Sequence, residues 1–297
     1  MPSPDSPRRG PKERSSGLLV ACAQWLPTPG DPEANLKSAV YWVCQAADAG
    51  ADMVVLPEMW PCGYDSRSLA ADAAAAAEPV PGKRSEELAE LARRHAMWVI
   101  AGSVPERDHV RIYNTALAFD RNGRLAARHR KAHLYDPTGE PAVFHPGDRL
   151  TSFADAELGH VGLLVCFDGD FPESGLWLAA RGVELVVLPS AYEWEARGYW
   201  DSYYPAAALA AGQWWVMANQ CGTTTSGTLL GASRVISPAG RIVAEARRAE
   251  PGQTPEPELL LCRLEESAAD VGAREFAALL RNSSRAELYL SPRADTP

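Results

Sequence analysis

The chain lacks the sequence features of several classes of protein. No apolar run approaches the length of a membrane-spanning helix, and the stretch 18–23 is cut short by Gln24 and Trp25, so we predict neither a membrane anchor nor a signal peptide. The six histidines are scattered and show no ligand spacing such as HExxH. We therefore expect no bound metal and no cofactor.

Cysteine and basic residues are also sparse. Only six cysteines occur in 297 residues, and none forms a CxxC pair. A chain of this length buries a sizeable core without disulfides, so we expect a reducing compartment and a cytoplasmic location. Lys and Arg number 29 against 38 Asp and Glu, which gives a formal net charge of -9. That balance argues against nucleic acid as a partner and gives no reason to expect binding to an anionic membrane.

The hydrophobic pattern predicts one α/β domain over residues 17–291. Residues 1–16, rich in Pro, Ser and charge, are expected to form a disordered leader, and 292–297 a tail. Helices are predicted at 31–49, 85–95, 171–181, 201–211 and 265–281, with a loop or short helix at 70–77. Strands are predicted at 18–25, 53–57, 98–104, 113–119, 125–131, 161–166, 183–189, 214–219, 229–237, 241–246 and 258–264. This order favours a sheet core with helices outside it, and a hairpin joining 113–119 to 125–131.

Three of the predicted strands end on reactive side chains. Glu58 follows 53–57, Lys131 ends 125–131, and Cys166 ends 161–166. Together they supply the functional groups needed for amide hydrolysis through a thioester. The carboxylate can accept the thiol proton, the thiol can attack, and the ammonium can stabilise the oxyanion. Each signal is weak when taken alone. Glu58 also suits a solvated strand end, Lys131 a surface lysine, and Cys166 a buried structural cysteine.

The residues after Cys166 predict a sharp turn into a helix. Asp170 and Glu173 flank Pro172 with the spacing of a capping box. This arrangement would aim a helix N-terminus at the thiol and favour the thiolate.

In their order and sequence context, the stretches that carry Glu58, Lys131 and Cys166 resemble those of the nitrilase, or carbon–nitrogen hydrolase, superfamily. Further matching stretches are Val20-Ala21-Cys22-Ala23-Gln24, Phe144-His145-Pro146-Gly147, Leu188-Pro189-Ser190-Ala191, Ala218-Asn219, Gly231-Ala232-Ser233, Ser237-Pro238-Ala239-Gly240 and Ala286-Glu287-Leu288-Tyr289. The resemblance implies a four-layer α-β-β-α sandwich that pairs into a homodimer or a higher homo-oligomer. It also implies that Glu58 is the general base, Lys131 the oxyanion stabiliser and Cys166 the nucleophile, with the backbone N–H of Phe167 completing the oxyanion hole.

A second glutamate and the residues after the cysteine refine this resemblance. Glu140 stands four residues before Phe144, where many relatives carry a glutamate, although a plain loop charge is the alternative. Cys-Phe-Asp-x-x-Phe-Pro-Glu is similar to the amidase and N-carbamoyl-hydrolase branches. The expected activity is hydrolysis by water of a small aliphatic amide or a ureido compound through a Cys166 thioester, with release of ammonia or an amine. Acyl transfer to an amine, nitrile hydrolysis and a catalytically silent scaffold remain the alternatives.

The substrate pocket is predicted from the residues that follow the catalytic strands. The expected lining residues are Trp60, Tyr64, Tyr135, Asp168, Tyr192, Glu193 and Trp194. Aromatic walls with the Glu193 carboxylate would suit an aliphatic substrate that carries a cationic amine. An exposed loop charge beside Glu195 is an equally good interpretation of Glu193, and core packing is the more common role of a tryptophan.

Overall fold

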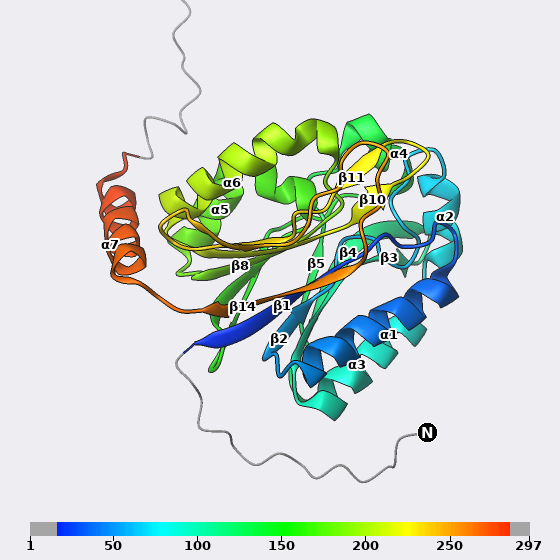
Figure 1. The fold of residues 1–297 in the computed structure, drawn as a ribbon, viewed down its shortest axis with the longest axis horizontal. Coiled ribbons are helices and arrows are strands. Elements are labelled where there is room, and N and C mark those ends of the chain that lie inside the picture. The colour runs from blue at the N-terminus through cyan, green and yellow to red at the C-terminus, as the bar shows by residue number, and fades with distance from the viewer. Residues whose placement is uncertain (1–16, 286–297) are drawn as a thin grey trace, which may run out of the picture.

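Two six-stranded β-sheets lie face to face in the computed structural model, which describes residues 17–285 (Figure 1). The strand order of the first sheet is β14-β1-β2-β3-β4-β5, and that of the second is β13-β12-β9-β8-β7-β6. The first contains β1 (Leu18–Gln24), β2 (Met53–Val55), β3 (Trp98–Asp108), β4 (Arg111–Phe119), β5 (Leu125–Arg130) and β14 (Glu258–Leu264). The second contains β6 (Thr151–Asp155), β7 (Gly159–Leu163), β8 (Leu185–Ser190), β9 (Trp214–Asn219), β12 (Arg234–Ile236) and β13 (Ile242–Glu245). A separate small pair consists of β10 (Cys221–Thr223) and β11 (Thr228–Leu230).

Helices cover the outer face of each sheet. The first sheet carries α1 (Pro32–Asp48) and α3 (Lys83–His95), and the second carries α5 (Pro172–Ala180) and α6 (Arg197–Ala211) (Figure 1). This layering confirms the predicted α-β-β-α sandwich. The remaining helices are α2 (Leu69–Ala76), α4 (Glu140–Val143) and α7 (Ala268–Ser283), with 3-10 turns at Asp136–Thr138, Cys166–Asp170 and Trp194–Ala196. Of the helices in residues 17–285, none has the length and apolar character needed to cross a membrane.

The alternation of side chains along the strands creates two apolar layers. In β2, Met53 and Val55 face the second sheet, whereas Val54 between them packs toward α1 and α3. All three side chains are fully buried. Removing a side chain of this size from water stabilises the fold by about 1.5–3 kcal/mol, which explains why such short strands hold their positions in the sheets.

The parallel strands of both sheets direct their carboxyl ends to one region. β1, β2 and β3 are parallel, and so are β7, β8 and β9. Hydrogen bonds join the sheets there. For example, the Glu58 N–H donates to the Ser190 carbonyl (3.3 Å), and the Gln220 amide donates to the Glu58 carbonyl (2.7 Å). Ligands usually bind at the carboxyl ends of parallel strands, so the fold presents its site at this junction.

Several predicted details differ from the structure. β7 ends at Leu163, so Cys166 lies beyond the strand and begins a 3-10 turn. The predicted capping box at Asp170 is wrong, because Phe171 occupies the N-cap of α5 without a side-chain cap bond. The edge strand β6 was not predicted. The hairpin formed by β4 and β5 is confirmed as antiparallel. The proposed leader, the tail and the stretch 286–289 lie outside the described residues.

Candidate active site

A buried lysine bridges two buried glutamates. Lys131 directly follows β5, and its Nζ donates to Glu58 Oε1 (2.9 Å) and to Glu140 Oε1 (2.8 Å). Asn114 of β4 donates to the same two oxygens, at 2.8 Å and 3.4 Å. The backbone N–H of Tyr135 donates to Glu140 Oε2 (2.6 Å), which fixes the second carboxylate. The structure therefore brings together three of the side chains that the sequence singled out, in a cluster with almost no exposure to solvent.

The electrostatics of this cluster leave Glu58 suited to accept a proton. Burial raises the pKa of Glu58, against the lowering effect of the nearby Lys131. Burial also acts to lower the pKa of Lys131, but Glu140 and Glu58 outweigh it and keep the ammonium charged. Glu58 Oε2 is buried and has no hydrogen-bond partner among the described residues. An unpaired buried carboxylate oxygen is costly to maintain and is an available proton acceptor.

Cys166 occupies a strained turn between β7 and α5. Its φ angle is 44°, in the left-handed region that a residue with a Cβ rarely adopts. The residue is 9% exposed. Burial and the charge of Glu58 raise the pKa of the Cys166 thiol well above its usual value, despite Lys131 and the backbone N–H of Ala191. Burial therefore opposes the thiolate that the turn was expected to favour, and a nearby base would assist its formation.

A second buried network fixes the strand end that carries Lys131 to the turn that carries Cys166. The Asp168 carboxylate accepts hydrogen bonds from His129 Nε2 and His133 Nδ1, both at 2.9 Å. It also accepts from the backbone N–H groups of Ala132 (3.0 Å) and Val165 (3.2 Å). Burial acts to raise the pKa of Asp168, but the histidine hydrogen bonds hold it below its usual range. The ionised Asp168 thus links the end of β5 in the first sheet to the turn after β7 in the second.

A narrow cavity of about 50 Å³ opens at Cys166. The described residues that line it are Tyr64, Tyr135, Cys166, Phe167, Asp170, Ala191, Tyr192, Glu193 and Ala196. The rings of Tyr135 and Phe167 meet edge to face, with centroids 5.1 Å apart. The Tyr64 hydroxyl is 2.9 Å from the Thr138 hydroxyl, which holds this side chain in the wall. A cavity of this size holds a small polar group and a few water molecules.

The family model described as carbon-nitrogen hydrolase matches residues 19–259. The chain belongs to the carbon–nitrogen hydrolase family. The chain is similar to the omega-amidase of Xenopus tropicalis, to which it is 30% identical over 236 residues, or 76% of this chain and 83% of that protein. The human deaminated glutathione amidase is 33% identical over 240 residues, or 76% of this chain and 72% of that protein.

Solved structures of an amidase from Nesterenkonia sp. extend the similarity to the fold. One superposes with a TM-score of 0.75 at 28% identity, covering 93% of this chain and 96% of that one. A mutant of the same amidase in complex with butyramide superposes with a TM-score of 0.76 at 28% identity, covering 92% and 96% of the two chains. This carbon–nitrogen hydrolase is accordingly an enzyme that acts on C–N bonds other than peptide bonds, by amide hydrolysis.

The pocket of this carbon–nitrogen hydrolase differs in part from the sequence-based expectation. Tyr64, Tyr135, Tyr192 and Glu193 line the cavity at Cys166, as does the ring of Phe167. Three expected lining residues do not, and the reasons differ from one to the next.

Trp60 packs in the layer between the first sheet and its helices and donates its indole N–H to the Ala101 carbonyl (2.7 Å). Asp168 is fully buried in its histidine network. Trp194 packs against the main core, with the Arg197 guanidinium over its ring. These placements correct the predicted pocket.

Asn114 and Asp170 are polar residues of the site that were not predicted, and Ala191 and Ala196 are unpredicted lining residues. Asn114 lies within β4, and a single amide side chain in a strand does not by itself indicate a functional site. Asp170 was assigned to a helix cap, but its side chain lines the cavity. Its carboxylate accepts hydrogen bonds from Tyr192 (3.2 Å) and Tyr204, which explains why it does not cap α5.

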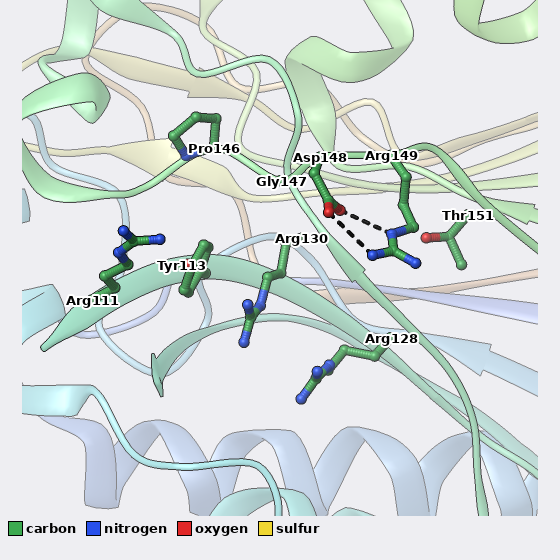
Figure 2. Close-up of a pocket in the computed structure, with 9 residues that line it drawn as sticks. All are labelled: Arg111, Tyr113, Arg128, Arg130, Pro146, Gly147, Asp148, Arg149 and Thr151. Carbon is green, nitrogen blue, oxygen red and sulfur yellow. Dashed lines mark hydrogen bonds and ion pairs between the residues drawn. The ribbon is translucent and has the colours of Figure 1, made fainter. Parts of the chain in front are cut away.

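A larger cavity of about 380 Å³ lies on the opposite face of β5 (Figure 2). Its described lining residues are Arg111, Tyr113, Arg128, Arg130, Pro146, Gly147, Asp148, Arg149 and Thr151. We refer to it as the arginine cleft. Arg128 and Arg130 of β5 line this cleft, whereas His129 between them binds Asp168 on the other face of the strand. Lys131, which directly follows β5, binds Glu58. None of its described lining residues is a cysteine, so the larger of the two cavities is not the one at Cys166.

Proposed function

We propose that the protein hydrolyses small aliphatic primary amides, or the related N-carbamoyl compounds, through a thioester at Cys166. The observation that carries this proposal is the unpaired Glu58 Oε2 in a buried cluster that acts electrostatically on the Cys166 thiol. A relative bound to butyramide supports a short aliphatic substrate. Water is the proposed second reactant, and no cofactor is required by these steps.

In the first half-reaction, Glu58 accepts the thiol proton while Cys166 sulfur bonds to the amide carbon. The carbonyl oxygen becomes an oxyanion, which the Lys131 ammonium and the Phe167 N–H stabilise. The proton held by Glu58 passes to the amide nitrogen. The C–N bond then breaks, ammonia leaves and the thioester remains.

In the second half-reaction, Glu58 accepts a proton from water as the water oxygen bonds to the thioester carbon. The C–S bond breaks, the sulfur regains the proton from Glu58, and a carboxylic acid leaves. Glu140 acts by holding Lys131 in place and by offsetting its charge, because the hydrogen bond between them is 2.8 Å long. An amine arriving in place of water would give acyl transfer.

The decisive experiment is mass spectrometry of the full-length protein mixed with butyramide. We expect an acyl adduct on the peptide that contains Cys166, together with stoichiometric release of ammonia and butyrate. Cys166→Ala should form no adduct, and Glu58→Gln should slow its formation roughly a thousandfold. A hydroxamate formed with added hydroxylamine at a rate above hydrolysis would favour acyl transfer. Turnover by Cys166→Ala would refute the mechanism.

We also propose a cytoplasmic homodimer. All six cysteines are free thiols, which supports a reducing compartment. Large apolar side chains are exposed on α5, α6 and α7, among them Leu176, Leu209 and Phe276. A second copy would remove this surface from water. Light scattering of the purified protein should give about twice the chain mass, and a monomer at micromolar concentration would contradict this.

A further inference from the structure

The cavity at Cys166 has acidic walls. Of the described residues that line it, Asp170 and Glu193 are carboxylates and none is basic. Lys131, which acts on the charge of Asp170, is shared between two glutamates of the catalytic cluster. The cavity therefore has an excess of negative charge.

Glu193 is a partly buried carboxylate without a partner. It follows β8, and within residues 17–285 its side chain has no hydrogen bond and no ion pair. Arg197, one turn further along the chain, lies over the ring of Trp194 instead. Burial raises the pKa of Glu193, and so does the like charge of Glu195. A bound cation would relieve both effects.

Asp170 is the second charged wall. Its carboxylate accepts hydrogen bonds from Tyr192 of the loop after β8 and from Tyr204 of α6. Burial raises its pKa to about 6, against the lowering effects of both tyrosines and of Lys131. It is therefore ionised at neutral pH and accepts two hydrogen bonds, while its remaining lone pairs can accept from a ligand. Its charge raises the pKa of Cys166, which shows that it acts on the reacting sulfur.

We propose that Asp170 and Glu193 select an amide whose acyl chain ends in a protonated amine. This inference rests on the proposed function, because it takes Cys166 as the attacking group. The ammonium would lie against the two carboxylates, with the aliphatic chain between the rings of Tyr135 and Tyr192. A substrate that ends in a carboxylate would be repelled by the same walls. Charge-assisted hydrogen bonds to a carboxylate in a partly closed cavity are strong enough for this discrimination.

The test compares three amides of similar length on the full-length protein: 5-aminopentanamide, hexanamide and glutaramate, which end in an ammonium, a methyl and a carboxylate. We expect kcat/KM to be about tenfold higher for 5-aminopentanamide than for hexanamide, and lowest for glutaramate. Asp170→Asn and Glu193→Gln should each reduce the ratio of the first two about fivefold. Glu195→Gln removes an exposed charge two residues from Glu193 and should change the ratio less than twofold.

Two results would overturn the inference. One is a glutaramate rate equal to that of 5-aminopentanamide, and the other is a preference for the ammonium that survives both substitutions. Failure of the proposed function is a separate outcome, in which none of the three amides is hydrolysed.

Alkylation of Cys166 then decides the question without turnover. Iodoacetate should react more slowly than neutral iodoacetamide, and Asp170→Asn should bring the two rates closer by about threefold. An unchanged rate ratio in Asp170→Asn would contradict acidic selection.

Discussion

Two cavities share the strand β5, and they differ in what surrounds their charges. In the arginine cleft, Arg149 pairs with Asp148, and the two side chains are 77% and 78% exposed. On the other face, Lys131 pairs with Glu58 and Glu140 at zero side-chain exposure. Exposed pairs are screened by water and contribute little, whereas buried charges interact strongly and cannot lose a partner cheaply.

This difference supports the smaller cavity as the proposed site of the reaction. Figure 2 shows the arginines that line the cleft, with Asp148 beside Arg149, and both members of this pair are exposed. Water can solvate each of these groups, so their pairing perturbs no nucleophile. At Cys166 the surrounding charges change the pKa of a thiol and a carboxylate together. The contrast predicts that equivalent substitutions on the two faces will have very different effects.

The largest expected contrast is between neighbouring residues. Lys131→Met should reduce kcat/KM for butyramide by roughly a thousandfold, because it removes the proposed oxyanion donor and leaves Glu58 and Glu140 unpaired in the interior. Arg130→Met removes the neighbouring cation, which lines the arginine cleft. It should reduce kcat/KM less than threefold. Ammonia release measures both. Circular dichroism should show both variants folded, and similar losses of activity would remove the basis of the comparison.

The next contrast concerns stability. Asp168→Asn should lower the free energy of unfolding by about 3–5 kcal/mol, because an amide cannot accept from all the donors that surround this fully buried carboxylate. Asp148→Asn makes the same change in the cleft, where this carboxylate is exposed and pairs only with Arg149 among the described residues. It should leave the free energy of unfolding almost unchanged, because water solvates both partners. Urea unfolding followed by tryptophan fluorescence measures both. A larger loss for Asp148→Asn than for Asp168→Asn would reverse the argument.

The parts of the molecule that could be predicted are those with local signals. The buried runs of β8 and β9 are almost entirely apolar. The candidate reactive residues Glu58, Lys131 and Cys166 stand shortly after the strands β2, β5 and β7. The sequence does not carry the information that depends on distant partners.

Asp170 illustrates this limit. Its spacing from Glu173 fits a helix cap. In the structure its carboxylate instead lines the cavity and accepts a hydrogen bond from Tyr204, more than thirty residues later. Asn114 is a similar case. Its amide donates to Glu58 and Glu140, which are distant in sequence, so its role follows only from the fold. The edge strand β6 has few buried side chains and so gave no hydrophobic pattern.

The smallest expected contrast is in the pH dependence of substrate choice. Asp170 faces the tyrosine hydroxyls of Tyr192 and Tyr204, and Lys131 and Glu58 also act on its charge. Since burial raises its pKa to about 6, Asp170 is ionised at pH 7.5 and protonated at pH 5. The negative charge of the cavity should therefore be present above about pH 6 and lost as the pH falls through that value.

This titration should appear in a ratio of rates. We expect the ratio of kcat/KM for 5-aminopentanamide to that for hexanamide to fall roughly fivefold between pH 7.5 and pH 5. Protonation of Glu58 slows both substrates alike and cancels in the ratio. Asp170→Asn should remove the step near pH 6. Any pH dependence of the ratio that remains in this variant would come from Glu193. Arg130→Met alters charge only in the arginine cleft, so it should leave the step in place. A step that persists in Asp170→Asn and shifts in Arg130→Met would mean that the two faces of β5 are electrostatically coupled.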